Sequence, residues 1–316
     1  MPACRVSAVV VTWNSASHVV DAVRSLPPDV PAVVVDNASA DGSAEAARQA
    51  GARVLEAGAN LGFGPACNLG AEAAAPSDAV LFLNPDAALV DGRAALDALL
   101  SELDRDPAVA AAAPALTGDG QEFFQLRKLP TLGSLAREAL LVNRLFPRNR
   151  GLLAERYLDR PRDVPFDVEQ PAAAALLVKR DVFAALKGFD PAFAPAWFED
   201  VDLCARILGA GGRIRFVPSA RATHVGGTTM NALPYRDFLP VYTRNLLRYL
   251  SRHAGAPTRL GARAVLLLGT LLRLTLLPFV RGDHERPDAA AAYGRVLAGL
   301  LGLGWRSALL PRPEAG

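Results

Sequence analysis

The chain has 316 residues, of which 51% are hydrophobic and 21% are charged, and its net charge is +2. This length and composition indicate a globular protein of one large domain or two joined domains. The three cysteines, Cys4, Cys67 and Cys204, show neither a CxxC motif nor a pairing pattern. That argues against a disulfide framework and predicts reduced thiols in the cytoplasm. No long apolar run precedes the first expected strand, so we expect no signal peptide.

Charge is unevenly distributed along the chain. Residues 233–316 contain twelve arginines and lysines against five acidic residues, a net charge of +7, whereas the remainder carries −5. A basic tail on a mildly acidic body favours an anionic surface as a partner, here the inner face of the cell membrane, and we expect no nucleic-acid partner.

Apolar strands alternate with helices from the beginning of the chain. The run Val6–Val11 predicts a first strand, followed by the polar turn Thr12-Trp13-Asn14 and by a helix at Ser17–Leu26. The same alternation then predicts a strand at Ala32–Val35, a helix with Ser43 as its N-cap, a strand at Arg53–Leu55, a helix from Pro65 and a strand at Val80–Leu83. We therefore predict a doubly wound, mostly parallel α/β sheet over the first 115 residues.

Polar residues follow the ends of successive strands, at Thr12, Asp36, Asn60 and Asp86. The carboxyl ends of parallel strands meet at one edge of an open sheet, where ligands bind, so this placement predicts a nucleotide site. No G-x-G-x-x-G motif follows the first strand, which argues against a dinucleotide site. Taken singly, each of these residues is better explained as a turn or cap residue. Their joint placement is what favours a binding site.

Asp86 lies just beyond the predicted strand Val80–Leu83, because Pro85 stops the strand's hydrogen bonding. A carboxylate in this place can hold a hard cation, and the cation can hold phosphate oxygens. The alternative is a turn aspartate that caps the next segment.

Three stretches, Val34–Ser43, Asn60–Gly64 and Asn84–Asp86, resemble the inverting family 2 glycosyltransferases, most closely a rhamnosyltransferase-like branch. The resemblance implies the GT-A fold. In that branch the metal motif Asp-x-Asp often reads Asn-Pro-Asp, as it does here.

A second group of acidic residues opens a predicted helix at Glu199, because apolar residues recur at i, i+3, i+4 and i+7 from Val201. Asp202 can pair with Arg206 one turn later. The resemblance implies that Asp200 is the catalytic base. The alternative is that these acids only complement the helix dipole.

Further strands are predicted at Ala172–Val178 and at Arg213–Val217, the second ended by Pro218, with a short helix at Asp181–Leu186 between them. His224 follows the last strand. A lone histidine is usually structural, but the resemblance places His224 where the family has a metal-contacting histidine.

The middle of the chain gives weaker signals. Phe123–Pro130 predicts a strand that leads into a loop, Leu132–Phe146 an amphipathic helix, and Gly151–Asp167 a surface loop. We expect Arg127 and Lys128 to be a solvated basic pair rather than ligands of a diphosphate.

The tail predicts helices, at Tyr235–His253, Arg259–Leu277 and Tyr293–Leu310. The second is strongly apolar, and its three arginines, Arg259, Arg263 and Arg273, share one narrow sector. Its apolar run of 17 residues is shorter than the ~20 residues of a membrane span. An interfacial helix with snorkelling arginines fits better, with a buried core helix as the alternative.

The resemblance and these patterns together define one set of expectations. Residues 1–115 bind the nucleotide sugar, residues 116–232 bind the acceptor and catalyse, and residues 233–316 attach to the membrane. The enzyme moves a sugar, with dTDP-rhamnose as the favoured donor, to a glycan or polyprenyl-diphosphate-linked acceptor with inversion. Asp200 is the base, Asp86 and His224 hold Mg²⁺ or Mn²⁺, and the substrate-binding residues are Thr12, Trp13, Asn14, Asp36, Asn60, Gly62, Asn68, Asn84 and Glu199.

Two other classes of protein share a nucleotide cleft of this kind. A sugar nucleotidyltransferase makes a nucleotide sugar and releases diphosphate, but it needs a basic loop after the first strand, which Thr12-Trp13-Asn14 does not supply. A non-catalytic nucleotide-sugar-binding or scaffold protein is the other alternative, given Asn84 in place of an aspartate.

Overall fold

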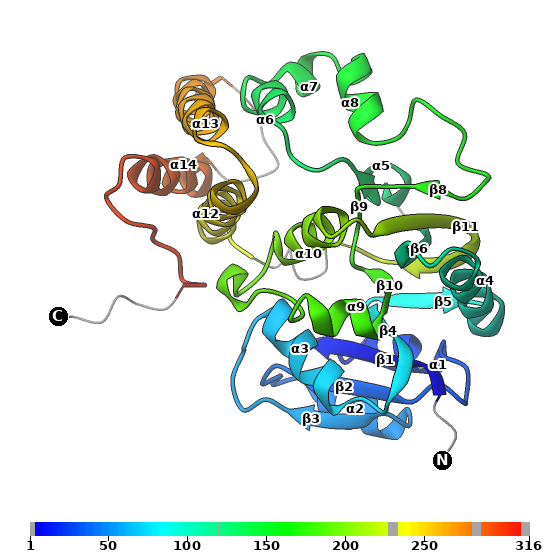
Figure 1. Cartoon of the computed structure of the whole chain (residues 1–316). Helices are drawn as coiled ribbons and strands as arrows, with labels where there is room; N and C mark the ends of the chain where they lie inside the picture. Colours follow the sequence, from blue (N-terminus) through cyan, green and yellow to red (C-terminus); the bar gives the residue numbers. More distant parts are fainter. Residues whose placement is uncertain (1–3, 119, 227–232, 280–285, 311–316) are drawn as a thin grey trace. The chain divides into compact units, whose positions relative to one another are not determined.

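The computed structural model of the chain describes residues 4–118, 120–226, 233–279 and 286–310 (Figure 1). The chain divides into two compact units. The first comprises Met1–Leu129, Arg156–Ala194 and Glu199–Gly226, and the second comprises Pro130–Glu155, Pro195–Phe198 and Gly227–Gly316. The three-part functional division expected from the sequence stays a prediction.

A mixed, mostly parallel sheet forms the first unit, with neighbouring strands in the order β3-β2-β1-β4-β10-β6-β11-β5 and β8 added beside β11 (Figure 1). Strands β1 to β4, β6 and β11 run in one direction, while β10 and β5 run against their neighbours. The strands span Cys4–Thr12 (β1), Ala32–Asp36 (β2), Arg53–Glu56 (β3), Ser77–Leu83 (β4), Ala87–Val90 (β5), Val109–Thr117 (β6), Phe166–Asp167 (β8), Ala175–Lys179 (β10) and Arg213–His224 (β11).

Helices cover both faces of this sheet, as its apolar runs require. Alternate residues of β1 serve opposite faces, so Ala8 and Val10 pack into one core while Val9 and Val11 pack into the other. The first core is completed by α1 (Val19–Arg24), α2 (Ser43–Gln49) and α4 (Gly92–Arg105). The second is completed by α3 (Phe63–Ala73), α9 (Arg180–Ala185) and α10 (Glu199–Gly209).

Short elements complete the first unit. A separate two-stranded antiparallel ladder joins β7 (Leu126–Arg127) to β9 (Gln170–Pro171). The helix α5 (Gln121–Phe124) precedes β7, and the 3-10 helix η1 (Pro191–Phe193) follows α9. Asp190 caps η1 by accepting a hydrogen bond from the Ala192 N–H at 2.8 Å.

Several local predictions for the first unit are wrong. Gly42, not Ser43, is the N-cap of α2, because its φ of 86° is easily adopted only by glycine and the Ser43 hydroxyl instead accepts a hydrogen bond from the Ser15 N–H. Pro218 does not end β11, since the strand shifts register between Val217 and Arg221 and continues.

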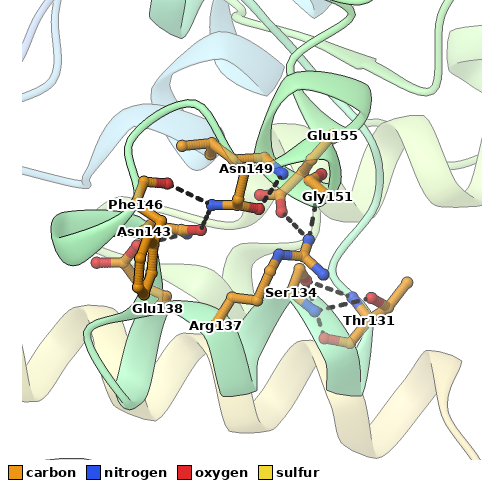
Figure 2. Close-up of polar contacts among 10 residues, drawn as sticks. Thr131, Ser134, Arg137, Glu138, Asn143, Phe146, Asn149, Gly151 and Glu155 are labelled. Atoms are coloured by element: carbon orange, nitrogen blue, oxygen red, sulfur yellow. Dashed lines mark hydrogen bonds and ion pairs between the residues drawn. The ribbon is translucent and has the colours of Figure 1, made fainter.

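Helices from two parts of the sequence build the second unit. Three come from the first part, α6 (Leu132–Ala139), α7 (Val142–Leu145) and α8 (Arg150–Glu155). Figure 2 shows the polar contacts that hold them. A reciprocal capping box of Thr131 and Ser134 starts α6, and Arg137 donates to Glu155 at 2.7 Å. Asn149 donates to the Phe146 carbonyl at 2.8 Å, so the connection between α7 and α8 is closed by its own side chain.

Two predictions for this segment are wrong. The expected single helix Leu132–Phe146 is broken at Leu141, whose φ is 61°. The expected loop Gly151–Asp167 contains most of α8 as well as β8. A left-handed residue and two very short elements leave no periodic signal in the sequence, which explains both errors.

The second part contributes α12 (Tyr235–His253), α13 (Ala256–Leu276) and α14 (Arg286–Leu300). The expected snorkelling of two arginines of α13 is wrong. Arg263 donates to the Leu300 carbonyl at 2.9 Å, and Arg273 donates to the Glu138 carbonyl at 2.7 Å. The Leu300 carbonyl ends α14, where intrahelical N–H partners run out, and the Glu138 carbonyl in the last turn of α6 also accepts the Leu141 N–H at 3.2 Å. Within the described ranges, none of the helices combines the length and apolar content needed to cross a bilayer.

Candidate active site

Thr12 and Asp36 lie side by side at the ends of β1 and β2, where they are direct neighbours in the parallel register. Both are buried. One oxygen of Asp36 accepts the Ser39 N–H at 3.0 Å. Its other oxygen, Oδ1, and the Thr12 hydroxyl are buried without a hydrogen-bond partner in the part of the chain that the structure describes. Because a folded protein rarely leaves such groups unsatisfied, this pair is suited to a polar ligand.

Asn14 shapes the turn that leaves β1. It has a positive φ of 50°, its side chain accepts the Ala40 N–H at 2.8 Å, and its own N–H donates to the Ser39 hydroxyl at 3.0 Å. Trp13 beside it is half-buried. These contacts connect the ends of β1 and β2, so they fix the distance between the two strand ends that carry Thr12 and Asp36.

The loop before α3 is held by two asparagines. Asn60 accepts the Gly62 N–H at 2.9 Å. Asn37, which the sequence analysis did not single out, is buried and both donates to the Gly62 carbonyl and accepts the Leu61 N–H, each at 3.3 Å. Gly62 has a φ of 85° and stands as the N-cap of α3 without a capping side chain. The first N–H groups of α3 are therefore presented beside the ends of β2 and β3.

Asn68 lies one turn into α3 and has both ends of its amide bound to the main chain. It donates to the Phe189 carbonyl at 2.7 Å and accepts the Phe189 N–H at 2.8 Å. The turn at Gly188 has a φ of 68°, and a Cβ there would stand 2.4 Å from the Asn68 side chain. Asn68 thus fixes this turn, and its expected role toward substrate stays a prediction.

Asp86 and His224 are brought together although 137 positions separate them. Asn84-Pro85-Asp86 connects β4 to β5, and β5 pairs with the end of β11 so that Ala87 faces His224. The His224 Nε2 atom lies 3.4 Å from Asp86 Oδ1. Two ligands that share one six-coordinate cation at ~2.1 Å stand about 3 Å apart, so the pair fits a shared cation. No group of three or more such ligands occurs among the described residues.

Three acids occupy the first turn of α10, and their surroundings differ. Asp202 is fully buried and bound to Arg206 at 2.7 Å, which confirms the predicted pair one turn apart. Arg206 also donates to the Gly188 carbonyl at 2.9 Å. This acid therefore stabilises the fold.

Glu199 and Asp200 both titrate above their ordinary range. Burial, together with the neighbouring charge of Asp200, raises the pKa of Glu199 well above its usual value. Burial also raises the pKa of Asp200, opposed by the Val201 N–H and the charge of Arg127. The two carboxyls are neighbours, so loss of the first proton from the pair opposes loss of the second.

The four residues before Glu199 belong to the second unit. Asn245 on α12 donates to the carbonyls of Ala196 and Trp197 at 2.9 and 3.1 Å. Trp197 and Phe198 both have left-handed backbones, with φ of 71° and 75°, and the Trp197 ring packs edge-on against Phe238 at 4.7 Å.

A cavity of about 640 Å³ lies at the other end of β1, near its first residues and α4. Its charges compensate one another, since Arg5 pairs with Asp104 at 2.8 Å and Arg93 pairs with Asp29. The polar groups described above lie at the far end of the same strand.

Comparison with known proteins identifies this arrangement. The sequence profile of Glycosyl transferase family 2 matches residues 7–165, half of the chain. The chain belongs to glycosyltransferase family 2. This confirms the family inferred from the three motifs and makes the protein an enzyme that transfers a glycosyl group. The N-acetylglucosaminyl-diphospho-decaprenol L-rhamnosyltransferase of Mycobacterium tuberculosis is 31% identical over 305 residues, which cover 87% of this chain and 98% of the relative.

Solved structures of other glycosyltransferases share the fold. A mannosyltransferase from Pyrobaculum calidifontis, in complex with GDP-Man and Mn²⁺, is 17% identical with a TM-score of 0.54 and covers 94% of this chain and 81% of its own. Glucosyl-3-phosphoglycerate synthase from Mycobacterium tuberculosis, with Mn²⁺ and UDP, is 17% identical with a TM-score of 0.51 and covers 79% and 80%. The family 2 glycosyltransferase described here therefore has a GT-A-like α/β fold.

Proposed function

We propose that this enzyme transfers L-rhamnose from dTDP-rhamnose to a sugar hydroxyl of a polyprenyl-diphosphate-linked acceptor, with inversion at the anomeric carbon. The observation that carries the proposal is the similarity to the mycobacterial rhamnosyltransferase, which extends over nearly the whole of both chains and whose name states a diphospho-decaprenol acceptor. Asp200 and the pair Asp86 and His224 supply the chemistry that such a transfer needs.

The donor nucleotide binds at the ends of the first strands. The unpaired oxygens of Thr12 and Asp36 bind the base and ribose, and the turn of Trp13 and Asn14 borders them. The N-terminus of α3, presented by Asn60 and Gly62, Asn68 one turn further on and Asn84 beyond β4 complete the donor side. Backbone N–H groups at a helix N-terminus favour negatively charged phosphate.

Asp86 and His224 hold Mg²⁺ or Mn²⁺ together with the donor diphosphate. One carboxylate and one imidazole are too few ligands for a tight protein site, so the cation binds mainly with the donor. When bound, it stabilises the negative charge that develops on the departing nucleotide diphosphate.

Asp200 acts as the general base. The acceptor hydroxyl gives its proton to the Asp200 carboxylate as its oxygen forms a bond to the anomeric carbon. The bond from that carbon to the diphosphate oxygen breaks on the opposite face, which inverts the configuration. The raised pKa of Glu199 beside it favours a single negative charge on the pair of carboxyls.

Transfer to purified lipid-linked acceptor tests the proposal directly. Radiolabelled dTDP-rhamnose, GDP-mannose and UDP-glucose are offered in turn with N-acetylglucosaminyl-diphospho-polyprenol, with and without EDTA. We expect incorporation from dTDP-rhamnose only, and loss of incorporation in EDTA. A nucleotidyltransferase would release free diphosphate instead, and a scaffold protein would bind the donor without consuming it.

The second unit attaches the enzyme to the inner face of the membrane. One side of α13 exposes Leu260, Leu268 and Leu271, and Phe279 follows it, 83% exposed. Such apolar exposure on a basic segment suits an anionic bilayer, where each nearby cation adds roughly 1 kcal/mol. We expect Leu268→Glu to release the protein from anionic liposomes, whereas Ser101→Glu on α4 adds the same charge and leaves binding intact. Equal binding of both variants would contradict this attachment.

A further inference from the structure

The short ladder between β7 and β9 stands directly beside Asp200. The two strands are antiparallel, and their register places Arg127 opposite Gln170. Four residues are too few for an independently stable sheet.

Hydrogen bonds at both ends close this ladder, and one of them ties it to the main sheet. The Ala172 N–H donates to the Gln125 carbonyl at 2.7 Å, and the buried Gln125 side chain accepts the Leu116 N–H of β6, also at 2.7 Å. On the other side, the Leu129 N–H donates to Glu169 Oε2 at 2.8 Å. These bonds fix the backbone from which the side chains of Arg127 and Gln170 project.

Gln170 is buried, and its amide nitrogen donates to Asp200 Oδ2 at 3.2 Å and to the Pro171 carbonyl at 3.1 Å. Both partners are pure acceptors when Asp200 is ionised, so the amide must present its nitrogen to them. Each carboxylate oxygen can accept more than one hydrogen bond, so Asp200 keeps acceptor capacity for an incoming hydroxyl.

Arg127 is also fixed. Its Nε donates to the Phe124 carbonyl at 3.3 Å, and its guanidinium lies 5.9 Å from the centre of the Phe124 ring. From there its positive charge lowers the pKa of Asp200 against the larger, opposite effect of burial. Among the described residues, the ionisable groups with a recorded electrostatic effect on or from Asp200 are Arg127 on β7, a cation, and Glu199 and Cys204 on α10.

We propose that Arg127 and Gln170 are positioning residues for the catalytic base: the ladder holds a hydrogen-bond donor and a positive charge against Asp200, so that its carboxylate is oriented and ionised when the acceptor binds. This inference rests on the proposed role of Asp200. It replaces the expectation that Arg127 is merely half of a solvated basic pair.

The test compares pH profiles of four full-length variants. Arg127→Met removes the charge, Arg127→Lys restores it, and Gln170→Leu removes the hydrogen bond at similar volume. Lys128→Met is the matched control, because Lys128 is the adjacent cation but lies over the Tyr157 ring, 5.9 Å from its centre. A neighbouring cation commonly lowers a carboxyl pKa by ~1 unit or more. We expect the acid limb of kcat to move up by about one pH unit in Arg127→Met, to return in Arg127→Lys, and to stay in place in Lys128→Met.

Gln170→Leu is expected to lower kcat at every pH by about tenfold, since orientation is lost in addition to charge stabilisation, with donor KM unchanged. An unmoved acid limb in Arg127→Met together with an undiminished kcat in Gln170→Leu would overturn the proposal, as would an equal shift in Lys128→Met. If Arg127→Met fails to fold, Gln170→Leu and Arg127→Lys still test the positioning role.

Carboxyl carbon NMR of labelled aspartate separates this idea from the proposed function. The Asp200 signal is assigned by its absence in Asp200→Asn, and its titration is followed in wild type and in Arg127→Met. A higher pKa in the variant supports the positioning role even if Asp200→Asn retains turnover and the base is another residue. An unchanged titration overturns the positioning role even if Asp200→Asn is inactive.

Discussion

The two ends of the central strands differ in whether their buried polar groups have hydrogen-bond partners within the protein. Near the start of β4, Arg180 donates to the Ser77 carbonyl at 3.0 Å, to the Ser7 hydroxyl at 2.8 Å and to the Ala71 carbonyl at 3.0 Å, in the last turn of α3. At the far end, the Thr12 hydroxyl and one Asp36 oxygen remain buried without a partner among the described residues.

This difference separates polar groups that stabilise the fold from those available for a ligand. Where the protein satisfies a buried group itself, a substitution should cost stability and leave chemistry alone. Where a group is left unsatisfied, a substitution should cost binding or turnover and leave stability alone, or even improve it.

The largest effect is expected for Asp200→Asn, which keeps the shape of the side chain and removes its basicity. Turnover should fall at least ~100-fold, within the range that proton transfer contributes, with donor Kd nearly unchanged. Measuring kcat and donor Kd on this variant decides whether Asp200 is the general base. Near-normal kcat would remove Asp200 from the mechanism and make Glu199 the next candidate.

Arg180→Met should show the opposite behaviour. Methionine keeps the aliphatic part of the side chain. It loses the hydrogen bonds that the guanidinium donates to the Ser7 and Ser77 hydroxyls and to the carbonyls at the end of α3. We expect the free energy of unfolding to fall by about 2–3 kcal/mol, with kcat at 25 °C unaffected in the folded fraction. Urea denaturation and a kinetic assay on the same preparation measure both. A variant of normal stability would show that internal pairing at this end contributes nothing.

Thr12→Val sharpens the comparison because stability and binding should change in opposite directions. The isosteric change removes a buried hydroxyl that the fold leaves unpaired, so unfolding free energy should stay level or rise by up to ~1 kcal/mol. Donor Kd should weaken about fivefold, equivalent to ~1 kcal/mol. Thermal denaturation and calorimetric titration with dTDP-rhamnose measure the two changes. Lost stability would mean that the hydroxyl has a structural partner.

The smallest effect is expected for Glu199→Gln, and it depends on pH. The raised pKa means that folded Glu199 binds its proton more tightly than the unfolded chain does. Its contribution to stability is therefore complete below the unfolded pKa of ~4.3 and is lost as the pH rises above that value. Gln imitates the protonated form, so Tm should rise at pH 8, by roughly 2–4 °C per kcal/mol, and stay near that of wild type at pH 4.5. An equal change at both pH values would contradict a protonated Glu199.

Patterns of a few residues in the sequence predicted those features of the fold that neighbouring residues determine. The alternation of strands and helices, the polar strand ends and the pairing of Asp202 with Arg206 all follow from spacing of a few residues. The strand β6 was missed, because Ala110 to Ala113 has low strand propensity and reads as compositional bias. It is a strand because it is buried between β10 and β11, which a single segment cannot reveal.

The features that the sequence did not predict depend on contacts between residues far apart in the chain. The interaction of Gln170 with Asp200 joins residues 30 positions apart, and that of Asn68 with Phe189 joins residues 121 apart. The arginines of α13 were assigned to a membrane interface because their spacing places them on one stripe. Whether such a stripe meets water, lipid or the last carbonyls of another helix depends on packing between distant segments.

The left-handed backbone at Trp197 and Phe198 limits the substitutions that protein engineering can make at these two positions. Two consecutive non-glycine residues at positive φ cost about 1–3 kcal/mol each, yet glycine at either position would relieve this strain only by deleting a packed aromatic ring, which costs ~3–5 kcal/mol. Glycine would also remove the Trp197 ring from Phe238 and loosen the chain that leads directly into Glu199 and Asp200. Selection for heat resistance and selection for turnover should thus both retain the aromatic residues at these two positions.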